Sequence, residues 1–268
     1  MSAYHHHIGV KQDYPQDYIN GITAKEYGAL FRELANIKSK NENIRLIEIG
    51  GGTGNLALQL QEKDFYILLT DLDEGLLSVA REKGVRNTQE LDILDENKPP
   101  ETIFDVAIMK SVQHEFPLEK LTIIHKNIYS ILDKEGVFFE WDAHVENNEQ
   151  SAWLKEYINL KDSLAGDSHL VENRHIYTSQ EIIQSLKDVG FKEVSIVNNF
   201  SYTISNNKFS EIYFKTSAGE IDEDKRKAFY EATKDLVQKM PKGITFENDQ
   251  QKQDFIFKIP AVLVKALK

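Results

Sequence analysis

The chain has 268 residues, of which 41% are hydrophobic, a net charge of -11 at pH 7 and no cysteine. This length and hydrophobic content suit one large globular domain. The lack of cysteine excludes disulfides, cysteine-ligated zinc or iron–sulfur sites and a cysteine nucleophile. The acidic charge disfavours nucleic acid as a partner, because nucleic-acid binding depends on basic surfaces. Without a long apolar stretch or a secretion signal, we expect a cytoplasmic protein that does not bind membranes.

Residues 44–145 alternate between strand-like and helix-like segments. The expected strands cover 44–49, 65–70, 87–91, 104–109 and 137–141, and the expected helices cover 53–61, 73–83 and 117–132. This alternation predicts an α/β fold with a doubly wound, mostly parallel sheet, in which ligands bind at the carboxyl ends of the strands.

The pattern after residue 145 is less regular. We expect helices over 151–164, 178–190 and 222–240, and strands over 191–197 and 254–265, the last interrupted by Pro260. The helix that begins at Thr178 has a capping box with Glu181, and Gly190 ends it. We interpret the chain as a single domain, with an N-terminal helical lid (1–40), a Rossmann-like cofactor core (41–200), and an insertion with a closing strand (201–268).

A glycine-rich turn follows the first expected strand. Residues 46–55 read LIEIGGGTGN, and glycine at 50, 52 and 54 permits positive φ and lets a ligand approach the backbone. The helix that begins near Thr53 would direct its free N–H groups to the same place. A dinucleotide site also has three glycines and an acid on the second strand, where Asp71 stands here. The spacing alone therefore does not decide between a dinucleotide and another nucleotide cofactor. A P-loop is unlike this turn, because Asn55 and Leu56 stand where it needs lysine and a hydroxyl residue.

Five segments in order resemble the class I S-adenosylmethionine-dependent methyltransferases of the small-molecule type. They read EIGGGTG at 48–54, LTDLDEGLL at 69–77, LDILD at 91–95, FDVAIMKSVQHEF at 104–116 and LDKEGVFFE at 132–140. The strands expected at 191–197 and 254–265 extend the likeness to that family's closing antiparallel hairpin, which implies a seven-stranded sheet with an antiparallel last strand. The resemblance implies S-adenosylmethionine as the cofactor.

The resemblance assigns the adenosine part of the cofactor to residues on the second and third motifs. Asp71 would accept hydrogen bonds from the ribose hydroxyls, and Leu72 would flank the adenine. Asp92 would accept from the adenine amino group, and the Ile93 N–H would donate to the ring. A purely structural role for Asp92, capping a turn, is the alternative.

The methionine part of the cofactor is assigned to the first and fourth motifs. Gly50 and Gly52 would leave room for it, and Glu48 would lie near its ammonium group. The backbone carbonyl of Lys110 would lie beside the sulfonium. Glu48 could instead serve only to satisfy buried N–H groups.

Catalysis in this reading needs alignment of donor and acceptor, and a base where the acceptor must lose a proton. His114, just past the fourth strand, is the leading candidate, with Glu115 as its partner or substitute. A histidine that only holds the loop is the competing reading for His114. His144, past the fifth strand, is a weaker candidate for contact with the substrate.

The N-terminal segment is rich in aromatic and imidazole groups. Tyr14 and Tyr18 are candidates for acceptor contact if this segment covers the site. The run His5–His7 does not predict a metal site, because consecutive side chains do not converge on one ion, and we expect no required metal.

We therefore expect methyl transfer to an O, N or C atom of a small metabolite, in a biosynthetic role. Aromatic residues near 149–175 and 201–253, among them Trp153, Tyr157 and Phe209, would line the acceptor site. The motif with which many nucleobase amino-methyltransferases orient their target is absent, and Met109 to Val112 stand there. A protein or peptide methyltransferase and a non-catalytic cofactor-binding module are the alternatives. The sequence leaves the oligomeric state open, with a homodimer as one option.

Overall fold

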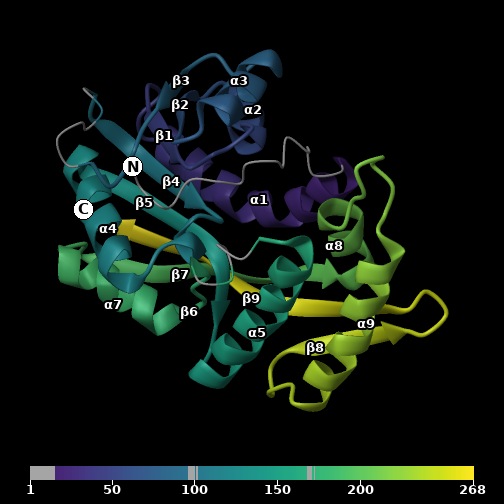
Figure 1. The fold of residues 1–268 in the computed structure, drawn as a ribbon. Coiled ribbons are helices and arrows are strands. Elements are labelled where there is room, and N and C mark those ends of the chain that lie inside the picture. The colour runs from purple at the N-terminus through teal and green to yellow at the C-terminus, as the bar shows by residue number, and fades with distance from the viewer. Residues whose placement is uncertain (1–15, 96–99, 101, 168–170, 172) are drawn as a thin grey trace.

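The computed structural model describes residues 16–95, 100, 102–167, 171 and 173–268 (Figure 1). In the first helix, α1 (Gln16–Lys38), side chains are described from Tyr27 onward. No helix in these ranges is long and apolar enough to span a membrane.

A twisted sheet forms the centre of the molecule, with the strand order β3-β2-β1-β4-β5-β9-β7. The first five strands of this order run parallel, and β9 is antiparallel to both β5 and β7. The strands are β1 (Arg45–Ile49), β2 (Tyr66–Asp71), β3 (Thr88–Glu90), β4 (Phe104–Lys110), β5 (Leu132–Val145), β7 (Glu193–Ser205) and β9 (Asp254–Leu267). Two short strands beyond the seven expected pair outside this order, β6 (Tyr177–Thr178) with β5 and β8 (Thr245–Asp249) with β9. The doubly wound sheet with an antiparallel last strand is thus confirmed.

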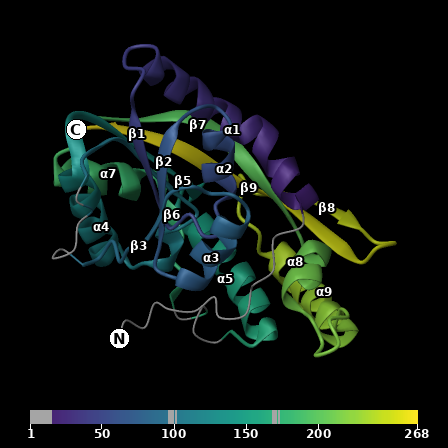
Figure 2. The ribbon, with the colours of Figure 1, turned by 90° about the horizontal axis from the view of Figure 1, so that it is seen from above.

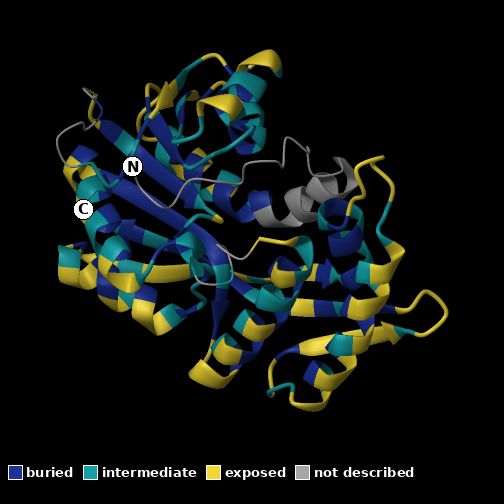
Figure 3. Ribbon diagram, in the orientation of Figure 1, coloured by how far each residue is buried: buried dark blue, intermediate teal, exposed yellow. Residues whose placement is uncertain are grey.

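Helices cover both faces of this sheet, as Figure 2 shows. One face packs against α1, α2 (Asn55–Gln61) and α3 (Glu74–Glu82), and the other against α4 (Leu118–Ile131) and α7 (Ser179–Val189). Neighbouring strand residues alternate between the two cores, so Leu46 lies in the first and Ile47 in the second. Both are fully buried, which explains the continuous apolar run of β1. The central strands are accordingly the buried part of Figure 3.

The helix ends follow the signals in the sequence. Asp73 caps α3 by accepting from the N–H groups of Gly75 and Leu76. Thr178 and Glu181 form the expected capping box at the start of α7, and Gly190 ends that helix with φ 116°.

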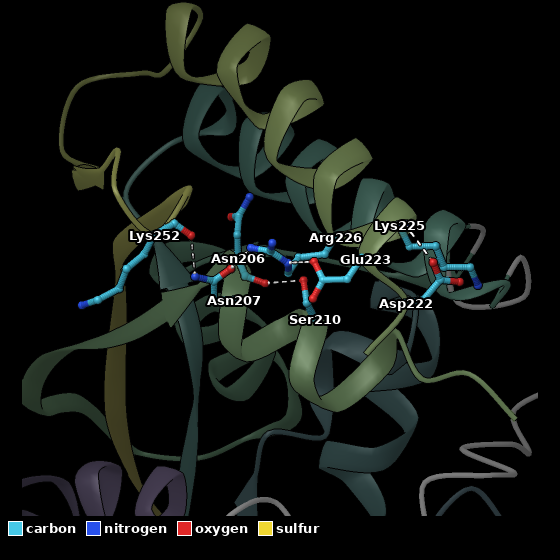
Figure 4. Close-up of polar contacts among 8 residues, drawn as sticks. All are labelled: Asn206, Asn207, Ser210, Asp222, Glu223, Lys225, Arg226 and Lys252. Carbon is cyan, nitrogen blue, oxygen red and sulfur yellow. Dashed lines mark hydrogen bonds and ion pairs between the residues drawn. The ribbon is translucent and has the colours of Figure 1, made fainter. Parts of the chain in front are cut away.

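A third apolar cluster forms what we call the C-terminal lobe, made by α5 (Asn148–Ala165), α8 (Asn206–Tyr213), α9 (Glu223–Gln238), β8 and residues 254–259 of β9. Polar contacts tie α8 to its neighbours (Figure 4): Asn207 Nδ2 donates to the Lys252 carbonyl, and Arg226 reaches Asn207 Oδ1. The division into lid, core and insertion stays a prediction.

Two strands are longer than the sequence predicted. β7 continues from residue 197 to Ser205, and β9 continues to Leu267 without the interruption expected at Pro260. On one side of β9, the pairing with β8 ends at Lys258 and the pairing with β5 begins at Ala261. Pro260 therefore lies where β9 has no partner on that side, a position that tolerates proline.

Candidate functional site

The glycine turn connects β1 to α2 through three residues with positive φ, Gly50 at 64°, Gly52 at 54° and Gly54 at 78°. A Cβ atom on Gly50 would lie 2.6 Å from Val112, and one on Gly54 would lie 2.6 Å from Val85. A Cβ on Gly52 would meet nothing closer than 4.0 Å. Gly50 and Gly54 are therefore required by packing within the protein, whereas Gly52 faces open space. Gly52 is the turn residue that a ligand can approach.

Asp71 connects the end of β2 to this turn. Its Oδ2 accepts from the Gly52 N–H at 2.8 Å and its Oδ1 accepts from the Asp73 N–H at 3.0 Å. Burial raises the pKa of Asp71, the two N–H groups oppose that effect, and the nearby charge of Glu115 adds to it. Each carboxylate oxygen retains a lone pair, so the group can still accept from two hydroxyls. Leu72 follows at the strand end and is half-buried.

Asp92 caps a turn, as the competing structural reading expected. Its Oδ1 accepts from the Leu94 N–H at 2.9 Å, and its carbonyl accepts from the Asp95 N–H at 3.0 Å. Ile93 is buried, and its carbonyl accepts from Asn127 at 2.7 Å. These contacts place both residues at the end of β3, and their roles toward adenine stay predictions.

Glu48 is buried in β1 on the face of the sheet that α1 covers, and its Oε2 has no hydrogen-bond partner among the described residues. Burial raises the pKa of Glu48 to about 8, against the opposing charge of Lys110. A buried carboxyl with an unpartnered oxygen is costly unless a donor completes it. An ammonium group could complete this oxygen, and the roles of Glu48, Gly52 and Asp71 toward the cofactor stay predictions.

His114 lies in a short 3-10 helix, η1 (Gln113–Glu115), directly after β4. Its Nδ1 lies 2.8 Å from Oδ2 of Asp142 on β5, and its side chain is 21% exposed. Burial would raise the pKa of Asp142, but the charge and hydrogen bond of His114, together with His144, hold that pKa below its usual value. Asp142 is therefore ionised and accepts from Nδ1–H, which leaves Nε2 of His114 as the basic nitrogen. The sequence named Glu115 as the partner of His114, whereas the structure places Asp142 at Nδ1.

His144 is not available to a substrate as the sequence suggested. It is 1% exposed, and its Nε2 lies 2.6 Å from Nε2 of the buried Gln113. Burial lowers the pKa of His144, with a smaller opposing effect from Glu140, so the ring is neutral near pH 7. His144 therefore fixes η1 and, through it, His114.

The loop that carries η1 is also held from the segment before α7. The His175 N–H donates to the His114 carbonyl at 2.9 Å, and the Tyr177 hydroxyl donates to the Phe116 carbonyl. Glu115 lies close enough for its charge to act on both Asp71 and Arg174. Burial lowers the pKa of Arg174, but Asp162 and Glu115 outweigh burial and raise it. Glu115 is thus placed beside the predicted ribose site.

The N-terminal candidates cannot be placed. Tyr14 and the run His5–His7 lie outside the described residues, and for Tyr18 only its position in α1 is described. The described part of α1 brings Tyr27 to the sheet, where its ring meets Trp141 edge-to-face at 5.2 Å. Among the residues with described positions, no three histidine or acidic side chains form a metal-binding group.

The expected aromatic walls of the acceptor site are wrong for Trp153, Tyr157 and Phe209. All three are buried in the core of the C-terminal lobe, where Trp153 stacks on Tyr157 at 5.8 Å. Tyr157 Oη also donates to Asn206 at 2.8 Å. These rings stabilise the lobe.

Comparison with known proteins agrees with this geometry. Residues 47–138 match the family model described as a methyltransferase domain. Residues 47–138 therefore carry a methyltransferase domain. The match confirms the resemblance found in the sequence, the assignment as an S-adenosylmethionine-dependent methyltransferase and the cofactor.

Two curated relatives and one solved structure illustrate the similarity. An uncharacterized methyltransferase of Staphylococcus carnosus is 26% identical over 182 residues, which cover 68% of this chain and 79% of that protein. The carboxy-S-adenosyl-L-methionine synthase of Nautilia profundicola is 25% identical over 182 residues, 60% of this chain and 76% of that enzyme. The YcgJ protein of Bacillus subtilis superposes with a TM-score of 0.64 at 17% identity, over 89% of this chain and 98% of that protein, which shows a shared fold.

Proposed function

We propose that this methyltransferase transfers the methyl group to an oxygen or nitrogen atom of a small metabolite, with His114 as the base that removes the acceptor's proton. The observation that supports this most is the pair formed by His114 and Asp142, at 2.8 Å, directly after β4. S-adenosylmethionine supplies a methyl group on a positively charged sulfur, so the protein has to align the acceptor and accept its proton.

The residues around His114 fix its orientation. Asp142 holds the tautomer with the proton on Nδ1, and Gln113, held by His144, fixes the neighbouring position in η1. The partial exposure of His114 keeps its side chain accessible, unlike that of His144. The pair favours an acceptor that gives up a proton from oxygen or nitrogen, such as a hydroxyl or an amine.

Two variants test the role of His114. His114→Gln should lower kcat by ~10²–10⁴-fold, with cofactor affinity unchanged, and Asp142→Asn should also lower kcat. Asp105→Asn is the matched control, because Asp105 pairs with Arg45 at the opposite end of β4. Unchanged kcat in His114→Gln would remove it as the base.

The similarity to a carboxy-S-adenosyl-L-methionine synthase supports a second candidate, in which the donor itself is modified. Mass analysis of the nucleoside products separates the two. Methyl transfer leaves S-adenosylhomocysteine, whereas carboxylation leaves a product heavier than the donor.

A further inference from the structure

Lys110 ends β4 at the edge of the sheet where the cofactor site lies. It pairs with Trp141 of β5, and the next residue, Ser111, has φ 57° while its N–H donates to the Trp141 carbonyl at 2.8 Å. A left-handed conformation in a residue other than glycine costs free energy and is found often at functional sites. The backbone therefore fixes where the Lys110 side chain begins.

The Lys110 side chain lies on the same face of the sheet as Glu48. Glu48 pairs with Ile108 across the parallel strands β1 and β4, and Lys110 is two residues further along β4. Residues two apart on a strand share a face. A basic side chain from β4 and an acidic side chain from β1 therefore lie on the same face of the sheet.

Aromatic rings hold the Lys110 ammonium group in this position. Its Nζ lies 5.6 Å from the ring centroid of Trp141 and 5.9 Å from that of Tyr27. Both rings are buried, and they fix each other by an edge-to-face contact. The faces of aromatic rings attract cations, so the lysine is favoured in its charged form there.

Glu48 does not neutralise this lysine at neutral pH. Burial raises the pKa of Glu48 to about 8, and Lys110 is the charge that most opposes the shift. The site is therefore prepared with a cation beside a carboxyl group that is largely protonated. The Lys110 ammonium group would repel the positively charged sulfonium of the cofactor. It favours cofactor binding only if it contacts an anionic group of the same molecule.

We propose that Lys110 Nζ binds the carboxylate of the amino-acid part of the methyl donor, while Glu48 takes the ammonium group on the same carbon. This inference rests on the proposed function, since it uses the same cofactor. An α-amino acid presents opposite charges on one carbon, and Lys110 and Glu48 present the complementary pair from β4 and β1. Lys110 thereby has a side-chain role besides its backbone carbonyl.

Calorimetry with two ligands tests this role without any turnover. S-adenosylhomocysteine carries the carboxylate, and its decarboxylated analogue keeps the adenosine, the sulfur and the ammonium group. Lys110→Met, which keeps an apolar stem over the rings, should weaken binding of S-adenosylhomocysteine by ~10- to 100-fold, the usual effect of losing a hydrogen bond to a charged group. It should leave binding of the decarboxylated analogue within about twofold, and Lys110→Arg should retain most of the affinity.

Lys63→Met is the matched control, because Lys63 Nζ also lies over an aromatic ring, that of Phe31 at 4.8 Å, away from the glycine turn. It should bind both ligands like the unaltered protein. Equal affinity of Lys110→Met and the unaltered protein for S-adenosylhomocysteine would overturn the proposal, and so would an equal loss for both ligands. Failure of the proposed function is distinct, since it appears as no methyl transfer by the unaltered protein or no binding of either ligand to it.

Discussion

Cofactor binding should depend on pH through Glu48. The pKa of this buried carboxyl is about 8 in the free protein, and an ammonium group within hydrogen-bond reach lowers a carboxyl pKa by about 1–3 units. Since the bound state has the lower pKa, affinity falls as the pH falls through 8 toward the pKa of the bound state. With a bound pKa of ~6, affinity for S-adenosylhomocysteine should drop ~25-fold between pH 8 and pH 6, or ~2 kcal/mol.

Calorimetry at pH 6, 7, 8 and 9 measures this dependence, and buffers with different ionisation enthalpies count the protons released on binding. At pH 7 we expect close to one proton released for each ligand bound. Glu48→Gln removes the titrating group, so it should bind more weakly at pH 8 and show a much flatter pH profile. The same steep profile in Glu48→Gln, or equal affinity of the unaltered protein at pH 6 and pH 8, would refute this reasoning.

Three further predictions concern the same site. Asp71→Ala should weaken S-adenosylhomocysteine binding by at least ~10-fold, measured by calorimetry, and retained affinity would remove Asp71 from the ribose site. Gly51→Ala should destabilise the protein by ~1–3 kcal/mol in denaturant unfolding, since its Cβ would lie 2.1 Å from Leu69. Gly52→Ala should weaken cofactor binding more than it lowers stability. A larger loss of stability than of binding in Gly52→Ala would contradict the assignment of Gly52 to the ligand. The folded pKa of Glu48 lies above its ordinary value of 4.5, so the stability of the protein is lost as the pH rises from 4.5 to about 8. Glu48→Gln should therefore be more stable than the unaltered protein by up to ~5 kcal/mol at pH 9 and by little at pH 4. Equal gains at both pH values would count against the raised pKa.

The sequence predicted those parts of the fold that local signals determine. The glycine turn, the cap at Asp73 and the capping box at Thr178 each depend on residues within a few positions of one another, and all three are present. The parallel strands followed from apolar runs, because both faces of the sheet are buried. The uninterrupted course of β9 through Pro260 was missed, because it depends on where two other strands end.

The candidate site was predicted less completely, because its contacts join distant segments. His114 was found from its place after β4, but its partner Asp142 comes from β5, 28 residues away. Trp153 and Tyr157 were read as acceptor walls because an aromatic core and an aromatic pocket have the same composition. The contacts of Trp153 and Tyr157 with the C-terminal lobe separate the two readings.

The most direct test of the central claim is transfer of a labelled methyl group from S-adenosylmethionine to a library of small metabolites, with the products identified by mass and position. We expect the label on an oxygen or nitrogen atom of a small molecule, formed together with S-adenosylhomocysteine, and a loss of ~100-fold or more in His114→Gln at unchanged cofactor affinity. Label on protein only, or a product formed at the full rate by His114→Gln, would contradict the account.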